Sequence, residues 1–351
     1  MRMKKILLVS LIMFLTGEIF LRLFYPQAEY SVTYAPWGWK HIPNTKITFW
    51  GEHPNWRWKL KPPIKIKYDD KGLRSYSWPY QSGVPNVQRI LILGDSFAED
   101  MGSVFENLVA TRLQKLFNYD EFGQDTKKAV AVINAGHYGF CNAQEYMYYL
   151  AEGHKFSPDI VLVFYAQDTA NPNYAELKEG QLILKWKKFT LSQKIYKNIA
   201  SLIRLHSHLG SYVLNSLHRI PKIENFIRKK QLNENIKITS IDSRDTNNSS
   251  DWDFKPIDKI LWREFNQLVK AENTTLILMN CMEDFTRKQK EFLDSENILH
   301  FAIIDSGAFK IYDKRKESYN PKKESHRFGY GGNEIVAEII YRFLEERGLV
   351  K

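Results

Sequence analysis

The segment RILILGDSFAED, residues 89–100, contains a short apolar run that stops at a Gly-Asp-Ser sequence. The four apolar residues at 90–93 are typical of a strand that is buried on both faces of a parallel sheet. Ser96 then stands between an acid and an aromatic residue, where a serine is either a helix cap or a nucleophile. The segments that follow the other strands decide between these two interpretations.

Apolar runs and helical segments alternate through the rest of the chain. Four further runs predict strands, at 130–133, 160–165, 274–279 and 298–304. Helices are predicted between and after them, at 104–117, 143–150, 254–272, 284–294 and 333–346. Continuous apolar strands that alternate with helices predict a parallel sheet covered on both faces. We therefore expect an α/β protein, a three-layer α/β/α sandwich with a short parallel sheet of about five strands.

The first 25 residues combine basic residues with an apolar run. Arg2, Lys4 and Lys5 precede residues 6–24, which are long enough to cross a bilayer core of about 30 Å. Glu18 and Arg22 stand four residues apart and share one helical face. A cleaved signal peptide is the alternative, but no small-x-small cleavage motif follows the run. We expect an uncleaved single-pass anchor in the cytoplasmic membrane, with a cytoplasmic N-terminus and a periplasmic or extracellular body.

Two other segments depart from the strand–helix alternation of the main domain, 88–351. Residues 26–87 are rich in Trp, Tyr and Pro and contain short alternating runs, which predict an irregular β lead-in. Their aromatic side chains either pack in a core or form a sugar-stacking surface. Residues 174–253 are predicted to be an insertion, with a hairpin at about 182–189, a helical stretch at 192–217 and a polar loop at 231–253.

Charge and cysteine content limit the partners and cofactors. The net charge of +10 permits anionic partners, but no nucleic-acid-binding motif organises the basic residues. We therefore expect a membrane surface or solvent to face them, and no nucleic acid. Cys141 and Cys281 could pair in an exported body, but two cysteines do not make a disulfide scaffold. No Cys/His cluster has metal-ligand spacing, so neither a metal nor another cofactor is expected.

Four polar segments are expected beyond the carboxyl ends of the strands, where open parallel sheets bind ligands. They read GDSF at 94–97, NAGHYG at 134–139, AQD at 166–168 and ESH at 324–326. Their order resembles the GDSL family, also called SGNH hydrolases, which has a GDS block, an N-x-x-x-x-G loop, a G-N-D-like turn and a late acid–His pair. The resemblance covers about 89–351, apart from the insertion, and implies the flavodoxin-like SGNH fold. The run from the anchor through DDKGLRS at 69–75 to residue 100 also resembles membrane-anchored bacterial members.

The resemblance assigns a role to each candidate site residue. A serine hydroxyl needs an imidazole to take its proton and a carboxylate to orient that imidazole. The family pattern implies that Ser96 is the nucleophile, His326 the base and Glu324 the orienting acid. It also implies an oxyanion hole made of the backbone N–H groups of Ser96 and Gly139 and the side-chain amide of Gln167.

Two of these residues depart from the family pattern. Gln167 replaces an Asn, which keeps the amide donor but lengthens its reach by one methylene. Glu324 replaces an Asp, and it could instead be a solvated acid among basic neighbours. His137 is a second candidate for the base, with the alternative that it is a loop residue that shapes the pocket.

The implied activity is that of a serine esterase or O-acyl transferase that works through an acyl-serine intermediate. Its expected substrate is an acylated small molecule or glycan, and a cell-surface glycan suits an anchored member. The alternative is a catalytically inactive SGNH-fold protein that binds glycans or assists their assembly.

Overall fold

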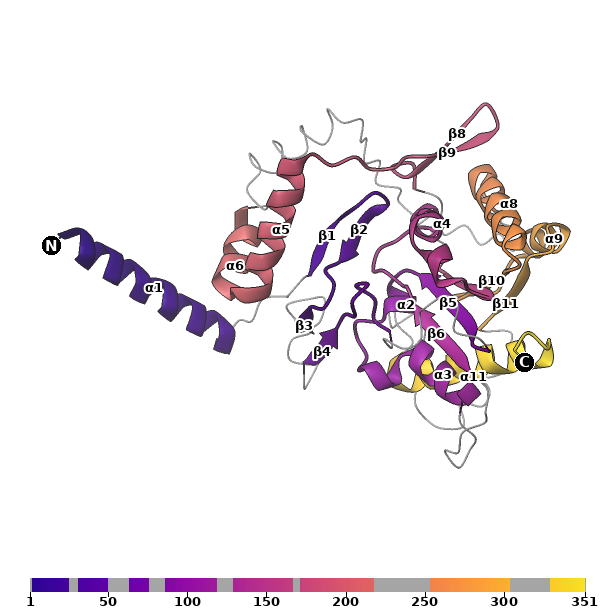
Figure 1. Cartoon of the computed structure of the whole chain (residues 1–351), viewed down its shortest axis with the longest axis horizontal. Coiled ribbons are helices and arrows are strands. Elements are labelled where there is room, and N and C mark those ends of the chain that lie inside the picture. Colours follow the sequence, from indigo (N-terminus) through magenta and orange to yellow (C-terminus); the bar gives the residue numbers. More distant parts are fainter. Residues whose placement is uncertain are drawn as a thin grey trace.

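The computed structural model describes residues 2–24, 31–49, 63–75, 86–118, 129–166, 171–217, 253–303 and 329–350. At its centre is a five-stranded parallel sheet with the order β11-β10-β7-β5-β6 (Figure 1). The strands are β5 (Gln88–Gly94), β6 (Val130–Asn134), β7 (Ile160–Tyr165), β10 (Thr275–Asn280) and β11 (Leu299–Ala302). Numbered along the chain within the sheet, this is the flavodoxin-like order 2-1-3-4-5. The predicted fold class is confirmed.

Residues of β5, β6, β7 and β10 enter two separate cores, one on each face of the sheet. In β5, Leu91 and Leu93 belong to the core on one face of the sheet, and Ile90 and Ile92 belong to the core on the other. Because every side chain of such a strand is buried, its sequence is a continuous apolar run without alternation.

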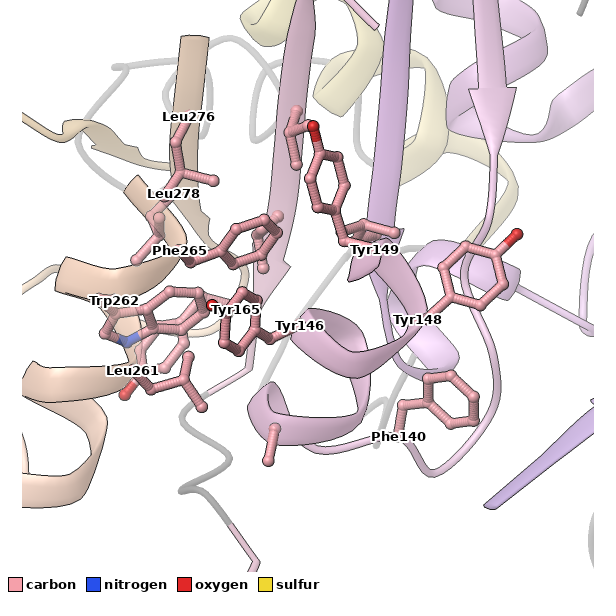
Figure 2. Close-up of a cluster of buried hydrophobic side chains, with 14 of the residues drawn as sticks. Phe140, Tyr146, Tyr148, Tyr149, Tyr165, Leu261, Trp262, Phe265, Leu276 and Leu278 are labelled. Atoms are coloured by element: carbon pink, nitrogen blue, oxygen red, sulfur yellow. The ribbon is translucent and has the colours of Figure 1, made fainter. Parts of the chain in front are cut away.

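Helices cover both faces of the sheet. One face carries α4 (Asn142–Ala151), α8 (Pro256–Ala271) and α9 (Arg287–Ser295), and the other carries α3 (Val109–Asn118) and α11 (Gly329–Glu346). Figure 2 shows the first of these cores, where aromatic side chains of α4 meet those of α8 and β7. Tyr146 lies 4.9 Å from Phe265, and Tyr165 lies edge-on to Trp262, centroid to centroid. Such aromatic pairs strengthen packing beyond the area they bury.

Two helices differ most from their predicted bounds. The segment predicted as one helix at 104–117 is a short 3-10 turn, η2 (Phe105–Asn107), followed by α3. Leu108 between them is extended, with φ −60° and ψ 143°, and this breaks the helix although the apolar periodicity continues. The last helix begins at Gly329 rather than Asn333. Asn333 is therefore inside the helix, with its side chain in a tertiary contact described below.

The lead-in forms two small antiparallel pairs. β1 (Val32–Ala35) pairs with β2 (Gly38–His41), and β3 (Lys46–Phe49) pairs with β4 (Ile64–Lys67). The second pair forms a small core that includes Ile47, Ile66, Tyr68 and Met101, so it packs against the chain just after the Gly-Asp-Ser turn. Trp37 is also buried, against Tyr148 of α4. These aromatic side chains of the lead-in serve packing.

The insertion contains a hairpin and two helices. The hairpin is β8 (Ala175–Lys178) and β9 (Gln181–Leu184), earlier in the chain than predicted. Its turn residues, Glu179 and Gly180, both have positive φ, which is the turn that two-residue hairpins favour. The predicted helical stretch is two helices, α5 (Leu191–His206) and α6 (His208–Leu217). The predicted polar loop falls almost wholly outside the described residues.

The N-terminal segment is a single helix, α1 (Arg2–Phe24). From Lys4 to Phe24 it is long and apolar enough to cross a membrane, as judged from length and composition. Figure 1 shows α1 leading away from the sheet, with α5 and α6 beside its C-terminal end.

The two cysteines are both free and buried. Cys141 lies in the core on the α4 face of the sheet and Cys281 in the core on the α11 face. Burial raises the pKa of both thiols, so they are neutral in the folded protein.

Candidate active site

Three of the four polar segments leave the sheet from neighbouring strands. Gly94 of β5 pairs with Phe164 of β7, and Ile92 of β5 pairs with Asn134 of β6. The carboxyl ends of β6, β5 and β7 therefore lie side by side, and the chain leaves each strand at one edge of the sheet. Ser96 and Gly139 lie in two of these segments. Gln167, Glu324 and His326 lie outside the described residues.

A tight strand-to-helix turn holds Ser96. A Cβ on Gly94 would lie 2.9 Å from the Cβ of Phe164, so only glycine allows the chain to turn this close to β7. Asp95 then caps α2 (Ser96–Glu99), and its carboxylate accepts a 2.9 Å hydrogen bond from Phe97 N. Burial raises the pKa of Asp95 to about 6. Ser96 is 7% exposed and begins a helix of one turn, so the helix dipole at this serine is smaller than that of a full-length helix.

The loop after β6 is fastened to this turn. Asn134 Nδ2 donates to the carbonyl of Ala98 at 2.8 Å, and its Oδ1 accepts from Gly136 N at 3.0 Å. A Cβ on Gly136 would lie 2.5 Å from both Ala98 Cβ and Glu99 N, so this glycine allows the loop to lie directly on α2. Gly139 has φ +75°, and no heavy atom lies within 4 Å of the place where its Cβ would be. The predicted oxyanion-hole residue is thus in a glycine conformation with open space beside it.

Glu99 joins the turn, the loop and the lead-in. It is fully buried, and its Oε1 accepts from Tyr68 OH at 2.8 Å and lies 2.9 Å from His41 Nε2. Its Oε2 accepts from Tyr138 N at 2.6 Å, in the residue before Gly139. Burial alone would raise the pKa of Glu99, but the charge of His41 and these hydrogen bonds lower it to about 2. Glu99 is therefore an ionised, multiply bonded carboxylate beneath the site.

The chain after α2 is held from two further directions. The guanidinium of Arg74 donates to the carbonyl oxygens of Glu99, Asp100 and Ser103. On the other side, Asn333 Nδ2 donates to Asp100 Oδ2 at 2.6 Å and to Ser103 Oγ at 3.0 Å. The start of α11 is thereby bonded to the segment that follows the Gly-Asp-Ser turn.

His137 is part of the core beneath the loop. It is buried, stacks on Phe140 at 4.6 Å and lies edge-on to Trp39. Its Nδ1 lies 2.9 Å from the carbonyl oxygen of Ala135. Burial, together with the nearby charge of His41, lowers the pKa of His137 to about 4. A neutral imidazole enclosed in this way suits a residue that shapes the loop better than a base that must reach a substrate.

Sequence analysis did not identify His41, Tyr68, Arg74 or Asn333 as supports of the site. Only Arg74 lies in a quoted segment, DDKGLRS at 69–75, and each of the four acts through a contact far along the chain. The available signal was Glu99, three residues after Ser96, because a carboxylate that is buried at this position needs several donors. Within the described part of the chain, no group of three His, Cys, Asp or Glu side chains could hold a metal ion.

No family model and no curated protein matches the sequence. Similar solved structures include that of TesA, at 12% identity over 74% of this chain and 99% of that chain, with a TM-score of 0.38. A putative lipolytic protein of the G-D-S-L family from Desulfitobacterium hafniense DCB-2 is 13% identical over 73% of this chain and 98% of that chain, with a TM-score of 0.35. A mutant of Axe2, an acetylxylan esterase from Geobacillus stearothermophilus, is 13% identical over 76% of this chain and 96% of that chain, also with a TM-score of 0.35.

Proposed function

We propose that this protein is a serine esterase or O-acyl transferase of the SGNH type, with Ser96 as its nucleophile. The observation that carries the proposal is the position of Ser96 on a capped turn at the end of the central strand, beside a loop bonded to the same turn. This arrangement holds the backbone N–H groups of Ser96 and Gly139 on adjacent segments, as an oxyanion hole requires. A helix cap alone would not require Gly136 to lie against α2.

The described residues also support the roles proposed for Gln167, His326 and Glu324. Gln167 follows Phe164 by three residues, and Phe164 is the register partner of Gly94. His326 precedes the first residue of α11 by three residues, and three extended residues span at most about 11 Å. Because Asn333 bonds α11 to Asp100, four residues after Ser96, chain length permits His326 to reach the serine. Glu324, two residues earlier, would orient the imidazole.

In the proposed reaction, His326 takes the proton of Ser96 as Oγ attacks the ester carbonyl. The N–H groups of Ser96 and Gly139 and the amide of Gln167 stabilise the oxyanion. Collapse of the tetrahedral intermediate expels the alcohol, which receives the proton from His326, and leaves an acyl-serine. Water or a sugar hydroxyl then attacks the acyl group, giving hydrolysis or transfer. We propose an acylated cell-surface glycan as substrate, with α1 as a membrane anchor and the body outside the cytoplasm.

Substitution of the triad tests this proposal. Ser96→Ala and His326→Ala should each abolish hydrolysis of p-nitrophenyl acetate and leave the thermal transition of the fold in place. Glu324→Gln should cost less, because the acid orients the base and is not itself protonated. Ser295→Ala, at the end of α9, is the matched control and should retain full activity.

Ser96→Ala activity above about a tenth of the wild-type rate would overturn the assignment of the nucleophile. If neither the wild type nor any variant hydrolyses p-nitrophenyl acetate or longer esters, the inactive glycan-binding alternative is favoured.

A further inference from the structure

We infer that α5 and α6 lie in the surface of the lipid bilayer, with an apolar face of these helices buried among the phospholipid headgroups and upper acyl chains. The inference goes beyond the proposed esterase activity and rests on the proposed membrane anchor. We call this surface the interfacial face. It consists of exposed large apolar or aromatic side chains, namely Leu191, Ile195, Tyr196, Ile199, Leu202, Tyr212 and Val213.

The interfacial face has the spacing of a helix stripe. Leu191, Ile195, Ile199 and Leu202 follow one another at intervals of four, four and three residues, so they lie on one side of α5. Leu191 is 74% exposed and Leu202 is 62% exposed. In a helix of a soluble body, such a stripe would face the core.

The side of α5 that carries Ala200 and Ser201 faces the protein. Both residues are buried, and the Ser201 hydroxyl donates to the carbonyl of Val32 in β1. These contacts fix the rotation of the helix, so the apolar stripe is directed away from the lead-in. The stripe is therefore a property of the folded protein and not of a loosely attached helix.

The anchor helix contacts the junction of α5 and α6 through Glu18 and Arg22, the two charged residues in its C-terminal half. Glu18 accepts hydrogen bonds from Ser207 Oγ at 2.9 Å, His208 N at 3.0 Å and Leu209 N at 2.9 Å. Arg22 donates to Glu18 at 2.7 Å and to a carbonyl at the end of α5 at 2.8 Å. A carboxylate in a membrane-spanning helix needs such partners, because lipid supplies none. The start of α6 must therefore be at the depth of Glu18.

That depth matches an interfacial helix. Glu18 lies six residues before Phe24, the last residue of the candidate span, and six residues of helix rise about 9 Å. Helices that lie in the membrane surface bury their apolar face about 5–10 Å into the boundary between headgroups and acyl chains. The anchor contact and the stripe on α5 thus indicate the same position relative to the bilayer.

The residues around the interfacial face suit this location. Tyr196 and Tyr212 are exposed, and tyrosine is enriched at the boundary between lipid and water. Lys188 and Lys194 are exposed near the start of α5, where their charges can meet lipid phosphates. Of the exposed large apolar side chains outside α1 in the described residues, only Val104 and Tyr138 fall outside the insertion. Seven of those in the insertion lie on α5 and α6 beside the anchor, and Leu177, Ile183 and Trp186 lie in or just after the β8–β9 hairpin.

Depth-dependent quenching tests the inference on the full chain. Single cysteines introduced as Ile195→Cys and Leu202→Cys would carry an environment-sensitive fluorophore, with the protein in vesicles of phosphatidylcholine and phosphatidylglycerol. Cys141 and Cys281 are buried, so the labelled wild type measures background. Lipids brominated near the headgroup end of their acyl chains should reduce emission at both positions to about half or less. Glu291→Cys, exposed on α9, is the control and should be quenched little.

A label at Leu15→Cys in α1 reports separately whether the anchor is inserted. Quenching at Leu15, with equal and weak quenching at Ile195 and Glu291, would overturn the inference but would support the membrane anchor. A blue-shifted Ile195 label that bromolipids do not quench would also overturn it, because the face would then be covered by protein. Absence of quenching at every position would contradict both the proposed membrane anchor and the interfacial location of α5 and α6.

Discussion

Asp95 and Glu99 lie in the same short motif and are both buried, yet their pKa values shift in opposite directions. Burial raises the pKa of Asp95 to about 6, and the hydrogen bond from Phe97 N lowers it only in part. Burial acts on Glu99 in the same direction, but His41 and the donors around it bring the pKa down to about 2. The number of partners therefore decides which carboxylate remains charged. The acid beside the proposed nucleophile titrates near neutral pH, and the acid beneath the loop does not.

Asp95→Asn tests this difference through the pH dependence of stability. The folded-state pKa of Asp95 is raised, so the folded protein binds the proton more tightly than the unfolded chain. The free energy of unfolding should therefore fall as the pH rises from about 4 to above 6, by up to about 3 kcal/mol from this group. Asn cannot titrate but still caps the helix, so the variant should lose this dependence. Urea unfolding in detergent between pH 4 and 7.5 measures both curves.

The exposed Asp294 on α9 provides the control, since Asp294→Asn should follow the wild-type curve. Wild-type and Asp95→Asn curves that stay parallel across this pH range would contradict the raised pKa of the buried Asp95.

In the loop at 134–139, the space beside the backbone of each glycine determines how a larger side chain would affect the candidate site. Gly136 allows contact with α2, whereas Gly139 has open space and a positive φ. Alanine at Gly136 would meet backbone and Cβ atoms of α2 that cannot rotate away, and such overpacking typically costs about 1–3 kcal/mol and displaces the loop. Alanine at Gly139 would cost about 1 kcal/mol in backbone strain and keep the N–H in place.

Gly136→Ala should therefore lower both the melting temperature and the esterase rate substantially, and Gly139→Ala should lower them modestly. Thermal denaturation and p-nitrophenyl acetate hydrolysis on the same preparations would compare the two. Equal losses in both variants would contradict the view that the loop lies directly on α2.

The elements that sequence predicted well are those whose signal is local. Strands β5, β6 and β7 lie where they were predicted, because a short continuous apolar run is typical of a strand that is buried on both faces. The predicted start of the helix at 104–117 was wrong, because the apolar periodicity continues through Leu108 although its backbone is extended. The hairpin lies earlier than predicted, because Glu179 and Gly180 form its turn, whereas the prediction followed the apolar run that comes after this turn.

The supports of the site could not be predicted, for a physical reason. His41, Tyr68 and Arg74 reach Glu99 or its neighbours across separations of 25 residues or more. Asn333 is the predicted first residue of the last helix, but it lies inside α11 and its side-chain amide donates to Asp100. Such contacts depend on the assembled fold, whereas Ser96 and Gly139 could be named because motif and strand end coincide.

For the molecule as a whole, the orientation of α1 in the membrane determines on which side of the membrane the main domain and the proposed reaction lie. Basic residues in the first turns of α1 predict that the N-terminus is cytoplasmic, and α11 ends close to residue 351. Alkaline phosphatase fused after Lys351 should therefore be active and should remain in the membrane fraction. An inactive phosphatase, with a cytoplasmic reporter active at the same position, would reverse the orientation. Release into the soluble fraction would show cleavage after α1.

The central claim is that Ser96 is an activated nucleophile, and covalent labelling by a fluorophosphonate tests it most directly. The probe reacts only with a serine whose proton is taken by a base, so it needs neither the natural acyl group nor the acceptor. We predict that the full-length protein is labelled, that the modified peptide identifies Ser96, and that Ser96→Ala and His326→Ala abolish labelling while Ser295→Ala retains it. A folded wild-type protein that remains unlabelled, or labelling that persists in Ser96→Ala, would contradict the account.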